Sequence, residues 1–326
     1  MGRGAWIVGL AALLAGCGVG GDRAPAGPTR TPPGLAQRFY PPEGWGWGLL
    51  QLGDAPAQRY GVSSPATAPR GQVLILPDYG ETAETWFETT ADLNAAGYTV
   101  WVLEGVGQGG SARLAGPRDL GQVRSLDPDA DAVRAMVRVI IRPKQPLVIL
   151  GQGVGAVTAT LAVEQGLRPD GLILSGPAFR PYPAADTPLL RKLGLGATRV
   201  PGGAGWRREG PAASPDPWRG QVTRLWQTAN PDLRMGAPSL DWIAAFNAGQ
   251  KAAQRNLDAA DVPILVIGGP GASGCGKAPR CEAVTLEQAK GPLELERDPV
   301  RAAWLAAVTG FIRDRLAPLP KPARGL

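Results

Sequence analysis

A short apolar run that breaks at glycines and resumes as a helix constrains this chain more than any other stretch. Residues 147–150 read Leu-Val-Ile-Leu, which is too short for a helix and predicts a buried strand. Gly-Gln-Gly-Val-Gly follows at 151–155, and residues 157–164 have the composition of a helix. A buried strand that turns sharply into a helix is a building unit of α/β folds.

The same alternation repeats along the chain. Further strands are predicted at 73–76, 99–103, 172–174, 263–267 and 282–286, and helices at 85–96, from Asp127-Pro128 onward and from Asp298-Pro299 toward Leu316. Because each strand is apolar throughout, both faces of the sheet must be covered. The sequence therefore predicts the α/β class, with a mainly parallel sheet and helices on both faces.

The N-terminus has the features of an export signal. Arg3 precedes an apolar run at 5–16 that is too short to span a bilayer and ends at Cys17. Leu-Ala-Gly-Cys at 14–17 resembles the lipobox of bacterial lipoproteins, in which the Cys is acylated and becomes the new N-terminus. The alternative is an ordinary secretory signal followed by a chance Cys. The lipobox predicts a lipid-anchored protein of the bacterial cell envelope that faces the periplasm, and Gly18 favours the outer over the inner membrane.

The domain boundaries follow from composition. Gly, Pro and Arg dominate the segment after Cys17, which predicts a flexible tether. The alternation of strands and helices stops between Pro177 and about Asp258, which predicts an insertion. The predicted organisation is a signal peptide at 1–16, a tether at 17–36, an α/β domain at 37–317 with an insertion at about 178–257, and a tail at 318–326.

Composition excludes several function classes. The 326 residues carry a net charge of +6, but the basic residues form no block, so nucleic-acid binding is disfavoured. The chain contains no His, which removes the usual general base at neutral pH and the commonest metal ligand. Cys275 and Cys281 lie in a Gly/Pro loop of a chain predicted to be exported, which favours a disulfide over a metal site. We expect no metal and no cofactor.

Five segments, in this order, resemble one enzyme family. They are Glu104–Ser111, Gly151–Ala156, Leu174–Ala178, Asn230–Ser239 with Trp242, and Cys275 and Cys281 with the run 295–298. Together they resemble the α/β-hydrolase family of lysophospholipases and monoacylglycerol lipases (serine aminopeptidase-like hydrolases), over roughly Gln37 to Leu316. The resemblance implies an α/β-hydrolase fold with a lid insertion, and in the family a Ser-Asp-His triad that cleaves carboxylic esters.

The departures from this family fall on the catalytic positions. Gly153 stands where the family has its nucleophilic Ser, Gly271 where it has the acid, and Gly291 or a neighbour where it has the His. The oxyanion loop reads Pro77-Asp78, and a carboxylate there would repel the anion that the hole stabilises. The sequence therefore predicts a catalytically degenerate member that binds a lipid-like ligand or a protein partner.

Two other functions stay open on the sequence. A hydrolase could use other side chains near the carboxyl edge of the sheet, namely Ser111, Ser175, Lys290, Asp78, Glu81 and Glu104, with Ser175–Lys290 as an imaginable pair. The third function is a structural envelope lipoprotein without a small-molecule site. Four insertion tryptophans, Trp206, Trp218, Trp226 and Trp242, either pack the insertion onto the core or line an apolar pocket for an acyl chain.

Overall fold

The computed structural model describes residues 24–114, 116–141, 145–182 and 187–316. The predicted signal peptide, Cys17 and the predicted tail at 318–326 lie outside these residues. Within them, no helix combines the length and the apolar character needed to cross a bilayer.

One eight-stranded sheet forms the centre of the domain, in the order β1-β2-β4-β3-β5-β6-β7-β8. The strands are β1 (Gly46–Leu50), β2 (Gln58–Ser63), β3 (Gly71–Leu76), β4 (Tyr98–Leu103), β5 (Leu147–Gln152), β6 (Gly171–Ser175), β7 (Ile264–Gly268) and β8 (Cys281–Thr285). Strand β2 is antiparallel to both β1 and β4, whereas β4, β3 and β5 to β8 are parallel. The predicted α/β class with a mainly parallel sheet is confirmed.

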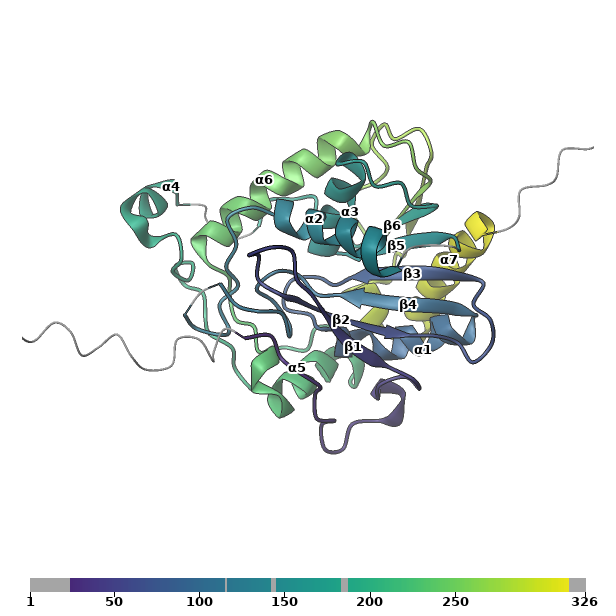
Figure 1. Cartoon of the computed structure of the whole chain (residues 1–326), viewed down its shortest axis with the longest axis horizontal. Coiled ribbons are helices and arrows are strands. Elements are labelled where there is room, and N and C mark those ends of the chain that lie inside the picture. Colours follow the sequence, from purple (N-terminus) through teal and green to yellow (C-terminus); the bar gives the residue numbers. More distant parts are fainter. Residues whose placement is uncertain (1–23, 115, 142–144, 183–186, 317–326) are drawn as a thin grey trace, which may run out of the picture.

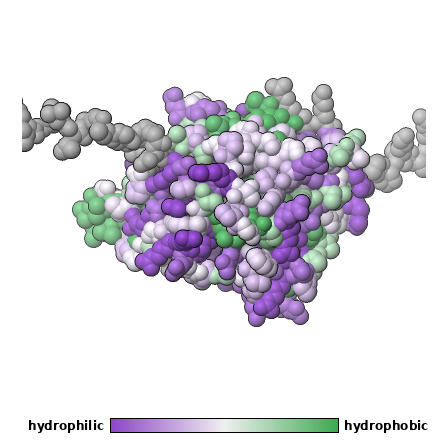
Figure 2. Space-filling model, turned by 90° about the horizontal axis from the view of Figure 1, so that it is seen from below, coloured by the Kyte–Doolittle hydropathy of each residue, from purple (hydrophilic) through white to green (hydrophobic). Residues whose placement is uncertain are grey.

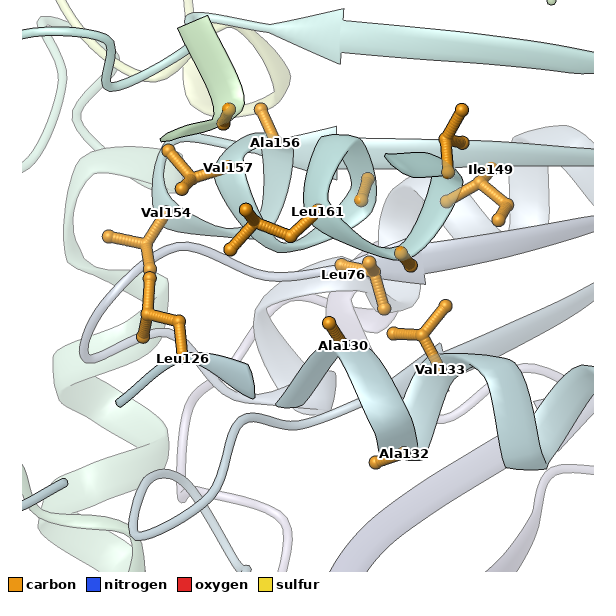
Figure 3. Close-up of a cluster of buried hydrophobic side chains, with 14 of the residues drawn as sticks. Leu76, Leu126, Ala130, Ala132, Val133, Ile149, Val154, Ala156, Val157 and Leu161 are labelled. Carbon is orange, nitrogen blue, oxygen red and sulfur yellow. The ribbon is translucent and has the colours of Figure 1, made fainter. Parts of the chain in front are cut away.

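Helices cover both faces of the sheet (Figure 1). On one face lie α2 (Asp127–Ala135), α3 (Val154–Glu164) and α6 (Leu240–Leu257), whose apolar residues share a core with Leu74 and Ile149. Figure 3 shows α2 and α3 in this layer, with Ala130, Val133 and Leu161 around Leu76. On the other face, α1 (Phe87–Ala95) and α7 (Asp298–Leu316) pack on the alternate residues of the same strands.

The chain between β6 and β7 forms the insertion. It contains α4 (Pro188–Leu190), η5 (Arg191–Leu195), α5 (Arg219–Ala229), η6 (Pro231–Leu233) and α6. Helix α6 packs against α3, so the last part of the insertion belongs to the helical layer over the sheet. Helix α5 contributes Val222 and Trp226 to a separate apolar cluster with Phe87.

The part of the predicted tether that the structure describes, residues 24–36, lies against the domain. The Ala26 N–H donates to the Gly110 carbonyl at 2.7 Å, and the Thr29 hydroxyl donates to Glu84 at 3.0 Å. The side chain of Asn230 exchanges two hydrogen bonds with the backbone of Arg30, at 2.8 and 2.9 Å. This segment is therefore fixed to the domain rather than a flexible tether, because its backbone groups have specific partners that composition does not reveal.

Candidate functional site

The turn from β5 into α3 has the backbone geometry of a nucleophile elbow. Gly153 stands at this turn with φ +53° and ψ −112°, a conformation that disfavours any side chain. A Cβ at Gly151 would lie 2.5 Å from the Gly155 carbonyl oxygen, and a Cβ at Gly155 would lie 2.0 Å from the Leu76 carbonyl oxygen. The flanking glycines are therefore required for the close approach of β3, β5 and α3.

Asp78, in the loop after β3, points its carboxylate at this elbow. Its Oδ1 accepts hydrogen bonds from the backbone N–H groups of Val154 and Tyr79, both at 2.7 Å. Val154 is the first residue of α3, and the positive end of a helix dipole favours a negative charge there. In an α/β-hydrolase, the N–H after the nucleophile and an N–H of the loop after β3 form the oxyanion hole. Asp78 therefore occupies the position of the hole with a carboxyl oxygen of its own.

The same carboxylate fills the space that a side chain at position 153 would need. A Cβ at Gly153 would lie 2.1 Å from the Asp78 Cγ and 2.3 Å from each of its carboxyl oxygens. No two unbonded heavy atoms approach so closely, so a side chain at 153 requires Asp78 to move. The elbow therefore has no room for a side chain at 153 while Asp78 keeps this position.

Two further carboxyl groups lie beside Asp78. Glu81 Oε2 accepts from the Asp78 N–H at 2.9 Å and from the Trp86 indole at 3.1 Å. The Glu294 side chain is fully buried, and neither of its carboxyl oxygens has a hydrogen-bond partner among the described residues. Burial and the nearby Asp78 charge raise the pKa of Glu81 to about 7. Burial and the Glu81 charge raise the pKa of Glu294 well above its ordinary value. Burial therefore favours the protonated form of both carboxyl groups.

The charge of the cluster is not balanced by basic groups. Within the described part of the chain, no Lys or Arg forms an ion pair with Asp78, Glu81 or Glu294. In those same residues, no group of three or more Cys, Asp and Glu side chains is arranged to hold a metal ion. Burial raises the pKa of Asp78, and its two backbone donors oppose that shift. The backbone N–H groups of Val154 and Tyr79 thus favour the charged form of Asp78, which burial disfavours.

The sequence profile of the family described as serine aminopeptidase, S33 matches residues 67–273, which is more than half of the chain. The chain belongs to the serine aminopeptidase S33 family. A monoacylglycerol lipase from Mycolicibacterium smegmatis is 28% identical over 219 residues, which cover 64% of this chain and 73% of that enzyme.

Solved structures agree on the fold. A soluble variant of the monoglyceride lipase from Saccharomyces cerevisiae, in complex with a substrate analog, superimposes with a TM-score of 0.65 at 17% identity, over 84% of this chain and 96% of that one. A thermostable carboxyl esterase from Bacillus coagulans, in complex with glycerol, gives 0.65 at 16% identity, over 84% and 99%. These comparisons confirm the α/β-hydrolase fold predicted from the five resembling segments.

Gly271 and Gly291, which the family resemblance predicts at the positions of the acid and the His, both lie in loops. Gly271 lies in the loop after β7 with φ +71°, and its carbonyl accepts a hydrogen bond from Arg180. The Gly291 N–H donates to Glu296 at 2.7 Å, and a Cβ at Gly291 would lie 2.6 Å from the Ala213 carbonyl oxygen. A side chain at 291 would therefore collide with the backbone of the insertion.

The alternative catalytic residues have structural partners. Ser175 is fully buried, and its hydroxyl accepts from the Trp304 indole at 3.1 Å. Ser111 is fully buried, and its hydroxyl accepts from the Arg59 N–H at 3.0 Å. Glu104 forms a buried ion pair with Arg59 at 2.6 Å, whereas Lys290 is exposed. The two serines and Glu104 therefore lie in the interior with polar partners, out of reach of a substrate.

The four insertion tryptophans have different environments. Trp242 is fully buried and contacts Tyr79 edge-on, with ring centroids 4.5 Å apart. Trp226 is fully buried against Phe87, at 5.5 Å. The Trp206 indole donates to Gln227, and Trp218 is 55% exposed. Trp226 and Trp242 thus pack the insertion onto the core.

Cys275 and Cys281 form a disulfide in the connection between β7 and β8, which confirms the prediction of a bridge. No residue of the elbow takes part in it, so the bridge stabilises the loop that follows β7 rather than the site.

A small cavity with both polar and apolar walls lies on the α2 side of the elbow, and sequence reasoning missed it. Its volume is about 20 Å³, which suits one water molecule, and Val154, Gln108 and Asp129 are among its lining residues. Asp129 is buried, and its Oδ1 accepts from the Val106 N–H at 2.7 Å. Burial raises the pKa of Asp129 to about 7. The sequence hides this residue because it lies in the first turn of α2, where an acidic residue is ordinary.

Proposed function

We propose that this chain is a non-hydrolytic member of the S33 family, which acts by binding as a lipid-anchored protein of the bacterial cell envelope. One observation carries the first part of the proposal. The Asp78 carboxylate lies where both the nucleophile and the oxyanion of the family reaction would have to be.

The energetics of acyl transfer support the loss of hydrolysis. In a serine hydrolase, loss of the nucleophile or the base costs about 10⁶ in kcat, and the remaining acceleration comes from the oxyanion hole and from substrate binding. Here the triad positions are glycines and the hole holds a carboxylate. A second anion in the same place would meet electrostatic repulsion, so the remaining acceleration is lost as well.

The burial of the insertion tryptophans indicates where on the domain a ligand would bind. Trp226 and Trp242 are buried in packing contacts, which supports a role for the outer surface rather than a deep acyl pocket. The proposed partners are the membrane, through acylated Cys17, and a protein or a lipid-like molecule at the surface. The alternative is a purely structural envelope lipoprotein. Such a protein would have the same lipid anchor and the same loss of hydrolysis, but no small-molecule site.

The test uses the full chain purified from bacterial membranes. Turnover of a short p-nitrophenyl ester and of a lysophospholipid is measured against protein concentration, with the same protein after heat denaturation as the blank. We expect no difference from the blank. Turnover that rises with protein concentration would overturn the proposal. Its persistence in Ser175→Ala and Ser111→Ala variants would then direct the search to other residues.

The anchor is tested separately on the same preparation. The mass of the N-terminal peptide is expected to show an acylated Cys17 with residues 1–16 removed. A Cys17→Ala variant is expected to be absent from the detergent-extracted membrane fraction. An unmodified Cys17 would refute the lipid anchor without bearing on the loss of hydrolysis.

A further inference from the structure

The segment Pro188–Leu195, formed by α4 and η5 and called here the Leu knob, exposes apolar side chains. Leu189 is 69% exposed, Leu193 67% and Leu195 42%, and the first two exceed every other exposed large apolar residue of the described chain. Helix α4 lies at one extremity of the molecule (Figure 1), and Figure 2 shows an apolar protrusion at the same end. Apolar side chains gathered on a protrusion mark an interaction site in a soluble domain.

The Leu knob is held firmly with its leucines outward. Leu190 packs on the core cluster of the α2–α3–α6 layer, and the Arg191 guanidinium pairs with Asp241 of α6 at 3.2 Å. The Asp241 N–H donates to the Gly196 carbonyl at 2.9 Å, which fixes the C-terminal end of the segment. Because one side of the knob is anchored in the domain, the exposure of Leu189 and Leu193 is part of the fold.

The Leu knob lies near the start of the described chain. Arg118 donates to the Ala24 carbonyl at 2.9 Å, and its neighbour Asp119 pairs with Arg199 at 2.8 Å. Arg199 follows Leu195 by four residues, a distance of at most roughly 15 Å. Adjacent residues of one loop thus hold both Ala24 and Arg199, which lies four residues after the Leu knob.

The proposed anchor limits how far this end can be from the membrane, and the inference rests on that part of the proposed function. Cys17 precedes Ala24 by seven residues, which span at most roughly 25 Å when fully extended. Acylation at Cys17 would therefore keep the end of the domain that carries the Leu knob close to the bilayer.

The charges around the Leu knob suit an anionic lipid surface. Lys192 lies between Leu189 and Leu193 in the sequence and is exposed. Arg191 and the 87% exposed Arg124 share a single acidic partner, Asp241. A surplus of basic side chains beside exposed leucines is typical of a surface that inserts among phospholipid headgroups.

We propose that the Leu knob inserts into the interfacial layer of the phospholipid bilayer that carries acylated Cys17. The anchor and the Leu knob then make two separate contacts with one membrane, which orients the domain with α4 toward the lipid.

The experiment places an environment-sensitive dye on the Leu knob. With Cys17 acylated and Cys275 bonded to Cys281, a Leu193→Cys substitution supplies the only reactive thiol among the cysteines. The labelled full chain is reconstituted into vesicles of phosphatidylethanolamine and phosphatidylglycerol. A Leu49→Cys variant is the matched control, because Leu49 is a leucine of β1 that is 52% exposed.

We expect the dye at 193 to shift to the blue and to be quenched by spin-labelled lipid tails, and the dye at 49 to stay accessible to aqueous iodide. A Leu189→Glu substitution in the Leu193→Cys chain should reverse the shift. If the protein co-floats with the vesicles but the dye at 193 reports an aqueous environment, the inference is overturned and the anchor is unaffected. An intermolecular disulfide between two unlabelled copies of the Leu193→Cys variant would overturn it in favour of a second copy. Failure to float, with an unmodified Cys17, would refute the anchor on which it rests.

Discussion

The carboxylate of Asp78 lies within 2.3 Å of the point where a Cβ at position 153 would be, and its Oδ1 accepts the N–H of Val154 at 2.7 Å. The two residues are therefore interdependent. With Asp78 in this position only glycine fits at 153, and without a side chain at 153 the carboxylate has room to bind the N-terminus of α3. The absence of a side chain at 153 and the position of the Asp78 carboxyl are thus one structural arrangement.

A Gly153→Ala substitution is expected to reduce the free energy of unfolding by about 2–4 kcal/mol, because it adds a steric clash to an unfavourable φ. Gly271→Ala is the matched control. Gly271 has a similar φ of +71°, but the nearest atom to an added Cβ is 3.9 Å away, so only the backbone cost of about 1 kcal/mol remains. Denaturant unfolding measures both.

The clash itself is isolated by a double-mutant cycle with Asp78→Gly. The cost of Gly153→Ala should fall by about 1–3 kcal/mol when the carboxylate is absent. Equal costs in both backgrounds would show that Asp78 does not occupy the elbow in solution.

Asp129 should make stability fall as pH rises. Its pKa is about 7 in the folded chain and 3.8 in an exposed Asp, so between these values the folded state binds more protons than the unfolded state. Its contribution is therefore complete below about pH 4 and is lost as the pH rises through 7, with a total of about 4 kcal/mol.

An Asp129→Asn variant should lack this part of the pH dependence, because the amide oxygen keeps the Val106 hydrogen bond and does not ionise. The variant should be more stable than the unaltered protein at pH 8, less so at pH 5, and similar to it below about pH 4. Parallel denaturation curves at four pH values check this, and equal slopes for the two proteins would contradict it. Glu81, whose pKa is also raised to about 7, should leave a residual slope of the same sign.

Arg59→Met should destabilise the domain by about 3–5 kcal/mol, because it leaves two carboxylates without their cation in the interior. Arg59 pairs with Glu104 at 2.6 Å and with Glu84 at 2.9 Å, and all three side chains are buried. Arg134→Met, which breaks the surface pair with Asp131, should cost less than about 1 kcal/mol. Thermal unfolding of both variants measures the two stability losses. A similar loss in both would contradict the burial of the Arg59 ion pairs.

Asn230→Ala should release the N-terminal segment from the domain, because both hydrogen bonds to the Arg30 backbone are lost. We expect faster tryptic cleavage after Arg30 and a loss of about 1–2 kcal/mol in stability. Gln51→Ala is the control, since the Gln51 side chain bonds only within its own exposed loop. Unchanged cleavage at Arg30 would show that other contacts suffice to hold the segment.

Local sequence predicted the central strands well. The runs at 73–76 and 147–150 lie within β3 and β5, and the Asp127 and Asp298 helix starts coincide with α2 and α7. The two strands are continuous apolar runs, and the two helices begin with Asp-Pro. The pattern that predicts each element is therefore contained in a few consecutive residues. Strands β1 and β2 were not predicted, because β1 is half-exposed and β2 contains Gln58 and Arg59. The partners that allow Arg59 to be buried, Glu84 and Glu104, lie 25 and 45 residues away.

The sequence alone determined that position 153 has no nucleophile, that the chain has no His, and that an acidic residue stands in the oxyanion loop. It also predicted the strand–turn–helix frame, since that frame depends on glycines close together in the chain. Only the tertiary structure decided that Asp78 fills the elbow. Asp78 and Val154 are 76 residues apart, and they meet because β3 and β5 are parallel neighbours whose carboxyl ends lie at the same edge of the sheet.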